Sequence, residues 1–207
     1  NRLFHVFVWY IATMELVFAS NNAHKLTEIQ AILPSQIILK NLSDIGFTQE
    51  LPETTGTISG NALQKAKTLF QLTGHPCFAD DTGLLVKALD DKPGVDTAHY
   101  AGIERNALAN MQKVLNELNG HSNREARFIT VIAYVDGNRE HVFEGEVKGR
   151  IAEQITGDGG FGYDPIFIPE GFELSFAELP VTTKNSISHR ARAMALFVDW
   201  LKDLPVN

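Results

Sequence analysis

The segment that most restricts the possible folds is the nearly unbroken apolar run FITVIAYV at residues 128–135. A run of this length, rich in β-branched and aromatic residues, is typical of a β-strand. Asp136 and Gly137 follow it, and residues 141–147 then read HVFEGEV. Asp-Gly between two strand-like segments is a strong signal for a tight turn, so the sequence predicts a β-hairpin here.

The other elements alternate between strand-like and helix-like patterns. Short apolar runs predict further strands at residues 14–19, 37–39 and 77–79. Apolar residues recur at helical spacing at residues 26–33, 61–73, 107–118 and 188–201. Residues 40–60 and 157–163 are rich in turn-forming residues and predict loops. Interleaved strands and helices with one hairpin predict an α/β fold in which helices pack on a mixed sheet.

The size and charge of the chain narrow the classes of function. The 207 residues, 44% of them hydrophobic, suffice for one sizeable core. A formal net charge of −7 argues against a nucleic-acid binder, whose affinity comes from clustered Lys and Arg. A polyphosphate ligand stays compatible with this charge, because a metal ion and a few lysines neutralise it locally. Cys77 is the only cysteine, so no internal disulfide can form and a reducing, cytoplasmic compartment fits best.

Residues 1–13, NRLFHVFVWYIAT, differ in character from the rest of the chain, which starts at Met14 with a strand-like segment. An Arg before an apolar stretch is weakly similar to a signal peptide, but His5 interrupts the apolar part. The stretch from Leu3 to Ala19 is too short and too polar for a comfortable membrane span. We interpret residues 1–13 as an upstream or added extension that forms an edge strand or a subunit contact, ahead of one domain at residues 14–207.

The first candidate site is the polar turn from Ser20 to Lys25, between a predicted strand and a predicted helix. Unpaired N–H groups and the helix dipole at a helix N-terminus favour an anion, and Lys25 would add a full positive charge. The plain alternative is ordinary capping of the helix by Ser or Asn. A Walker loop is excluded, because its glycines are missing.

The second candidate is Asp80-Asp81-Thr82-Gly83, at the end of a predicted strand. Successive strand residues point to opposite faces, so we expect one of the two carboxylates to enter a cleft. Such a carboxylate could hold Mg²⁺ and accept a proton from an attacking water. The alternative is an Asp-rich turn that only closes the strand.

The third candidate is the glycine-dense segment at residues 157–165, GDGGFGYDP. Its glycines let the backbone approach a ligand closely, and Phe161 offers a flat face for a base. The alternative is an aromatic residue that closes the edge of the core. Two aromatic residues alternating with glycine before an acid favour a functional role.

The fourth candidate is residues 184–190, KNSISHR, in which three basic groups surround an expected helix start. Ser186 or Ser188 is the expected N-cap. Basic residues at a helix N-terminus oppose the dipole, which indicates that they bind an anion or a carbonyl group rather than forming a solvated basic turn.

Together these segments closely resemble the Ham1/RdgB family of inosine/xanthosine triphosphate pyrophosphatases. The resemblance rests on SNNAHKLTEI, NALQKA, FADDTGL, PGV with YAG, GDGGFGYDPIF and KNSISHRARA, in the family's order, and it covers essentially residues 14–201. It implies an elongated α/β fold with a long mixed sheet, two lobes and an active-site cleft between them. It further implies Mg²⁺-dependent hydrolysis of ITP, dITP and XTP to the monophosphate and pyrophosphate, by a homodimer.

The resemblance also implies roles for individual residues. The phosphates would lie against Ser20, Asn21, Asn22, Ala23, His24, Lys25 and Lys65. Asp81 would be the metal-linked proton acceptor, with Thr82 beside the substrate and Glu53 as a second metal ligand. The purine would lie against Phe161, Gly162, Tyr163, Asp164, Lys184, His189 and Arg190, and donors from Arg190 or His189 would reject adenine.

Four positions depart from the family's pattern. Gly60 stands where the family often has Glu, Lys87 where Asp is common, and Asp96 and His99 where Tyr and Arg are usual. His99 matters most, because a mostly neutral imidazole replaces a permanent charge near the substrate. Two other functions stay open on this basis, a nucleotide sensor without catalysis and a pyrophosphatase for modified pyrimidine nucleotides.

Overall fold

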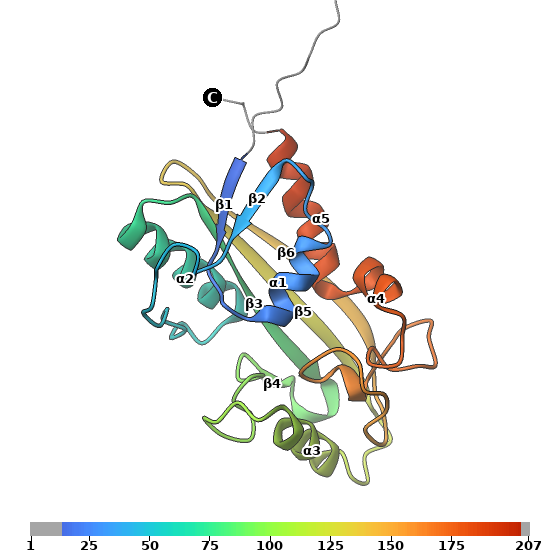
Figure 1. The fold of residues 1–207 in the computed structure, drawn as a ribbon. Helices are drawn as coiled ribbons and strands as arrows, with labels where there is room; N and C mark the ends of the chain where they lie inside the picture. The colour runs from blue at the N-terminus through green and yellow to red at the C-terminus, as the bar shows by residue number, and fades with distance from the viewer. Residues whose placement is uncertain (1–13, 204–207) are drawn as a thin grey trace, which may run out of the picture.

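The computed structural model describes residues 14–203 and shows one curved, mixed sheet with helices on both faces (Figure 1). The strands follow the order β2-β1-β3-β5-β6-β7, with β4 paired to β3. Their bounds are β1 Met14–Phe18, β2 Ile37–Lys40, β3 Cys77–Val86, β4 Lys92–Gly94, β5 Glu125–Val135, β6 Glu140–Ile151 and β7 Phe167–Pro169. Strand β1 is parallel to β2 and β3, whereas the other neighbours are antiparallel, so the predicted mixed sheet is confirmed.

The predicted hairpin is the longest part of the sheet. Strands β5 and β6 pair from Val135–Glu140 at the turn to Glu125–Arg150 at the far end. The side chain of Asp136 accepts hydrogen bonds from the backbone N–H groups of Asn138 and Arg139 and so closes the turn. The apolar run therefore forms a central strand with β3 on its other edge, as Figure 1 shows.

Helices cover the sheet because each presents one apolar face to it. The larger helices are α1 Ala23–Gln30, α2 Ile58–Thr73, α3 Ala107–Glu117 and α5 His189–Lys202, and α4 Val181–Ile187 is a single short piece. Helix α2 buries Ala62, Ala66 and Leu69 against one face of the sheet. Helices α1 and α5 pack together on the other face, where Met194 and Phe197 form part of the core.

Close packing of α5 on β6 requires a glycine. A Cβ atom at Gly145 would lie 2.2 Å from the carbonyl oxygen of His189 and 2.4 Å from the backbone nitrogen of Ala193. The missing side chain at residue 145 therefore sets how near the N-terminal turn of α5 comes to the sheet.

Most expected elements are confirmed, with two corrections. Asp80-Asp81-Thr82-Gly83 is not a turn, because β3 continues through it to Val86 and pairs with β5 along its whole length. The strand tolerates two carboxylates there because side chains from the helices neutralise them. Helix α4 was not predicted, and Lys184 lies within it rather than at the start of α5.

Two further outcomes concern the ends of elements. Ser188, one of the two expected caps, caps α5 by accepting a hydrogen bond from the N–H of Ala191 at 3.2 Å. The strand or subunit contact predicted for residues 1–13 lies outside the described residues. Within residues 14–203, the helices are too short or too polar to cross a membrane.

Candidate active site

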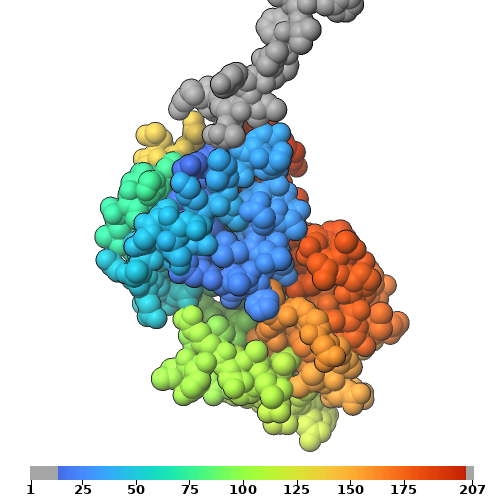
Figure 2. Space-filling model, in the orientation of Figure 1, coloured from blue at the N-terminus to red at the C-terminus, as the bar shows by residue number. Residues whose placement is uncertain are grey.

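A cleft of about 820 Å³, here called the main cleft, lies where β1, β3, α1, α2 and the loop before β7 meet the segment that follows β4. Figure 2 shows a hollow in this region, between the blue N-terminal residues and the green residues below them. Of the residues to which the family resemblance assigned roles, all except Ala23 line the main cleft. Segments from both ends of the chain, from Ser20 to Arg190, therefore meet at one place.

The turn after β1 both caps α1 and forms a wall of the main cleft. Asn22 is the N-cap, and its side-chain oxygen accepts a hydrogen bond from the N–H of Lys25 at 3.1 Å. Ser20 accepts from the N–H of Asn22 at 3.1 Å. The turn therefore caps α1 and also lines the main cleft. Its structure is compatible with both interpretations, helix capping and contact with a ligand.

Asp80 is a buried carboxylate held by two cations. Its two oxygens accept hydrogen bonds from Lys25 Nζ at 2.8 Å and from Arg190 Nη2 at 3.0 Å. Burial alone would raise the pKa of Asp80, but the charges of Lys25 and Arg190 hold it well below its ordinary value. Asp80 therefore fixes α1 and α5 against β3.

Glu28 of α1 joins this arrangement, although the sequence did not single it out. Its carboxylate contacts Arg190 Nη1 at 2.5 Å and Lys184 Nζ at 2.7 Å. Lys184 also contacts Asp164 at 2.5 Å. The signal that could have found Glu28 is its spacing, because residues i and i+3 share a face of a helix and Lys25 lies three positions before it.

Asp81 differs from its neighbour. It points towards α2, where its Oδ1 lies 3.5 Å from Lys65 Nζ, and its buried Oδ2 has no hydrogen-bond partner among the described residues. Lys65 also contacts Glu53, from the loop before α2. Burial raises the pKa of Asp81, and although Lys65 opposes this, nearby Glu53 and Asp80 raise it further. The expectation that one carboxylate enters the cleft is wrong, because both Asp80 and Asp81 line it.

The carboxylates of Asp81 and Glu53 suit a magnesium ion. Mg²⁺ prefers oxygen ligands and is often bound by one or two carboxylates together with water and substrate phosphates. Because the Oδ2 atom of Asp81 has no hydrogen-bond partner among the described residues, this carboxylate still has coordinating capacity. Residues 14–203 hold no cluster of three or more acidic, His or Cys ligands, so a metal here would need ligands from outside the protein.

The loop at residues 157–163 places an aromatic ring in the main cleft. Phe161 stacks on His24 with the ring centroids 5.1 Å apart and the planes at 12°. Its N–H donates to the carboxylate of Asp164 at 2.7 Å, which fixes the loop. Lys184 Nζ lies 4.9 Å from the ring centroid of Phe161, so the ring lies beside a cation.

Three nominated residues are engaged within the protein. The Arg190 guanidinium donates to Asp80, Glu28 and Thr82, so its nitrogens already have partners. Thr82 also shares a hydrogen bond of 2.7 Å with Thr130. His189 is buried and stacks on Phe128 at 4.5 Å, and its burial, together with the neighbouring cations, lowers its pKa well below the usual value.

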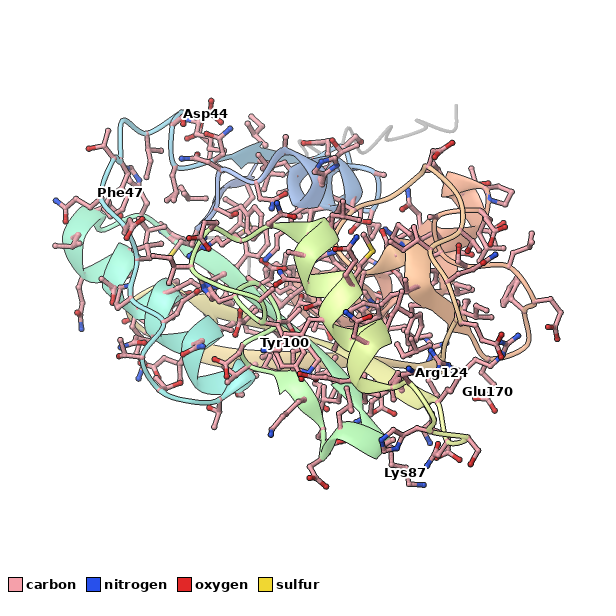
Figure 3. All side chains as sticks on the ribbon, turned by 90° about the horizontal axis from the view of Figure 1, so that it is seen from below. Asp44, Phe47, Lys87, Tyr100, Arg124 and Glu170 are labelled. Carbon is pink, nitrogen blue, oxygen red and sulfur yellow. The ribbon has the colours of Figure 1, made fainter. Side chains whose placement is uncertain are left out.

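The segment at residues 97–101, which follows β4, is here called the floor of the main cleft. Several hydrogen bonds hold it in place. The side chain of Asn110 in α3 accepts from the N–H of Ala101 at 2.7 Å and donates to the carbonyl of Ala98 at 3.0 Å. Tyr100 lies beside α3 (Figure 3), where Lys113 donates to its carbonyl at 2.7 Å. Tyr163 donates to the carbonyl of Thr97 at 2.8 Å and so joins the Phe161 loop to this floor.

The four departures from the family pattern lie in different surroundings. His99 lines the main cleft, and its buried Nδ1 has no hydrogen-bond partner in the described part of the chain. Asp96 lines a neighbouring pocket, and Gly60 lies in the first turn of α2 against the side chain of Thr55. Lys87 pairs with Glu125 at 2.7 Å at the outer edge seen in Figure 3.

The fold and the main cleft define an α/β protein in which cations, paired carboxylates and an aromatic ring line one cleft. Comparison with known proteins agrees with this class. A model of the Ham1 family matches residues 16–200, and the chain therefore belongs to the Ham1 family.

Named relatives match nearly the whole chain. A dITP/XTP pyrophosphatase of Porphyromonas gingivalis is 52% identical over 188 residues, which cover 90% of this chain and 97% of that protein. A dITP/XTP pyrophosphatase of Flavobacterium psychrophilum is 49% identical over 190 residues, covering 92% and 100%. Among solved structures, a HAM1 protein from Coxiella burnetii superposes with a TM-score of 0.85 at 36% identity, covering 92% of this chain and 100% of that one.

Proposed function

We propose that this protein hydrolyses the deaminated purine nucleoside triphosphates ITP, dITP and XTP to the monophosphate and pyrophosphate, and so clears them from the nucleotide pool. The observation that carries the proposal is one main cleft lined both by Asp81, Glu53 and Lys65 and by the Phe161 ring. A polyphosphate with a flat base spans such a cleft. The relatives named dITP/XTP pyrophosphatase support the same reaction.

In this proposal Asp81 is the general base. It accepts a proton from a water whose oxygen forms a bond to the α-phosphorus, while the bond from that phosphorus to the bridging oxygen of the β-phosphate breaks. The Oδ2 atom of Asp81 is free to take the proton, since no protein donor contacts it within residues 14–203.

Positive charge from the protein stabilises the phosphate chain. Lys65 lies beside Asp81, and Lys25 is in the N-terminal turn of α1, whose N–H groups favour an anion. Mg²⁺ is part of the proposal, with Asp81 and Glu53 as its protein ligands, and it would neutralise charge that develops on the phosphate oxygens. Lys65 contacts both of these carboxylates and so keeps them close together.

Selection of the base is assigned to the Phe161 loop. The ring would stack on the purine in place of His24. Lys184 carries three N–H donors and uses two of them for Glu28 and Asp164, which leaves one for a keto oxygen of hypoxanthine or xanthine. Adenine presents an amino group at that position, so the donor would be left unpaired and the substrate rejected.

A panel of nucleoside triphosphates with Mg²⁺, scored by pyrophosphate release, tests the proposal. We expect ITP, dITP and XTP to exceed ATP by at least about tenfold, because adenine would leave a buried donor without its hydrogen bond. Binding of ITP without release of pyrophosphate would indicate a sensor instead, and preference for modified pyrimidine nucleotides would indicate the related pyrophosphatase. Omission of Mg²⁺ should abolish release.

We also propose that the protein is a homodimer in the cytoplasm. Residues 14–207 of each chain would form one two-lobed domain. This proposal rests on the family resemblance of the sequence. Light scattering of the purified protein should give twice the mass of one 22.9 kDa chain. A monomeric mass would remove the dimer from the proposal without affecting the reaction.

A further inference from the structure

The cations of the main cleft are almost all neutralised by the protein itself. The side chains that each contact at least one carboxylate are Lys25, Lys65, Lys184 and Arg190. A nucleoside triphosphate brings about four negative charges, most of them on its terminal phosphates. Because these cations are already paired with carboxylates, they neutralise only part of the charge at that end of the ligand.

Arg105 is different. It lies in the segment between β4 and α3, is exposed, and makes no ion pair with the carboxylates of residues 14–203. It lines the main cleft and also a second pocket of about 640 Å³, here called the side pocket. The two hollows share Glu50, Leu51, Glu53, Val95, His99 and Arg105, so the side pocket continues the main cleft.

A series of contacts links the charged side chains of the main cleft. Lys184 lies against the Phe161 ring and contacts Glu28, which contacts Arg190. Arg190 shares Asp80 with Lys25. The charge of Lys65 acts on Lys25, and Lys65 contacts Glu53. The charge of Arg105 acts on Glu53, so Arg105 lies near Glu53, in the part of the main cleft that continues into the side pocket.

Hydrogen bonds at the start of α3 fix the backbone around Arg105. Arg105 has a φ of 53°, a left-handed conformation that is unfavourable for a residue with a side chain. Asn106 is the N-cap of α3 and accepts from the N–H of Ala109 at 3.0 Å, and Asn110 ties residues 98 and 101 to the same helix. Ordered structure on both sides thus maintains a strained residue at the mouth of the side pocket.

We infer that Arg105 binds the β- and γ-phosphates of the substrate, and the pyrophosphate product, at the junction of the main cleft and the side pocket. Its guanidinium supplies the permanent charge that His99 lacks at the neighbouring position. A guanidinium suits this role because its N–H groups match two phosphate oxygens at once. The inference rests on the proposed function, and it assigns a binding residue to the pyrophosphate that leaves the substrate.

Product inhibition of ITP hydrolysis tests the inference on the whole protein. In Arg105→Ala we expect the inhibition constant for pyrophosphate to rise roughly tenfold to a hundredfold, as expected for loss of a charge-assisted hydrogen bond. The inhibition constant for IMP should stay unchanged, because IMP lacks the terminal phosphates. Arg105→Lys should recover part of the loss, and Arg150→Ala, which removes an exposed arginine paired with Glu173, should match the wild type.

The outcomes separate the two proposals. If the wild type releases pyrophosphate from ITP but Arg105→Ala leaves pyrophosphate inhibition unchanged, the inference about Arg105 is wrong and the proposed function stands. Equal weakening of IMP and pyrophosphate would also overturn it, since that result indicates a general distortion of the cleft. Arg105→Gly, which fits the left-handed backbone without strain, should give the same selective loss as Arg105→Ala if the side chain acts on phosphate.

Discussion

Two adjacent aspartates of β3 show two ways of using a buried carboxylate. On one face of the sheet is the α1–α5 ion cluster, defined as Asp80, Lys25, Arg190, Glu28, Lys184 and Asp164, in which every carboxylate contacts a cation. On the other face are the α2-side carboxylates, defined as Asp81 and Glu53, which share Lys65. The ion cluster is complete without a ligand, whereas Asp81 keeps an oxygen without a partner among residues 14–203.

This contrast separates a carboxylate that holds the fold, Asp80, from one that is left for chemistry, Asp81. A fully paired buried carboxylate prefers its charged form strongly, and its removal leaves other charges uncompensated. A buried carboxylate with a spare oxygen has a raised pKa and retains the capacity to take a proton or a metal ion. The strand alternation that separates the two faces allows both roles at neighbouring positions.

The strongest change is expected from Asp81→Asn. The amide keeps the shape but cannot accept a proton, so the rate of pyrophosphate release from ITP should fall by about 10²–10⁴-fold or more. The free energy of unfolding should change little or increase, because a costly buried charge is removed. A variant that keeps full activity would remove Asp81 from the mechanism.

Asp80→Asn should instead reduce stability. It leaves Lys25 and Arg190 buried with less negative charge, so the free energy of unfolding should fall by about 3–5 kcal/mol. Urea unfolding followed by tryptophan fluorescence measures this change. Glu144→Gln, at an exposed position of β6, is the control and should stay within about 0.5 kcal/mol of the wild type. Equal effects of the two substitutions would show that the ion cluster does not hold the fold.

The pH dependence of stability should differ in sign between the two aspartates. The lowered pKa of Asp80 means that it stabilises the fold above the ordinary aspartate pKa of about 3.9, and this contribution is lost as the pH falls towards its folded pKa. The raised pKa of Asp81 means that the folded state holds its proton longer, so its contribution falls as the pH rises from about 3.9 through the folded pKa.

Thermal unfolding of metal-free wild type and Asp81→Asn, measured with a chelator present, checks this sign. We expect the variant to gain stability relative to the wild type as the pH rises from about 4 to about 7. A constant difference across that range would contradict the raised pKa of Asp81.

The weakest change is expected from Tyr163→Phe, which tests how the Phe161 loop depends on the floor of the cleft. Loss of the hydrogen bond to the Thr97 carbonyl should cost about 1 kcal/mol of stability and raise the KM for ITP roughly threefold. Tyr134→Phe, whose hydroxyl lies 3.3 Å from Asp136 at the hairpin, is the matched control and should leave KM unchanged. An unchanged KM in Tyr163→Phe would show that substrate binding by the loop does not depend on the floor of the cleft.

Local patterns in the sequence predicted the elements that carry the fold. The apolar run at residues 128–135 and its Asp-Gly turn became the β5–β6 hairpin, and the helical spacing at residues 61–73 became most of α2. The short helix α4 escaped prediction because its seven residues are too few to show a periodic apolar face. The extension of β3 through Asp80 and Asp81 escaped because paired acids usually indicate a turn.

The amino-acid sequence alone specified which residue types are present for an anionic, aromatic ligand and in which segments they lie. The three-dimensional arrangement was needed to show that Asp80 is neutralised while Asp81 keeps an oxygen without a partner in the described part of the chain. It was also needed to show that Arg105 lines the same cleft as the turn after β1. The physical reason is distance along the chain. Arg190 meets Asp80 across 110 positions and Lys184 meets Glu28 across 156, and no local pattern encodes such pairings.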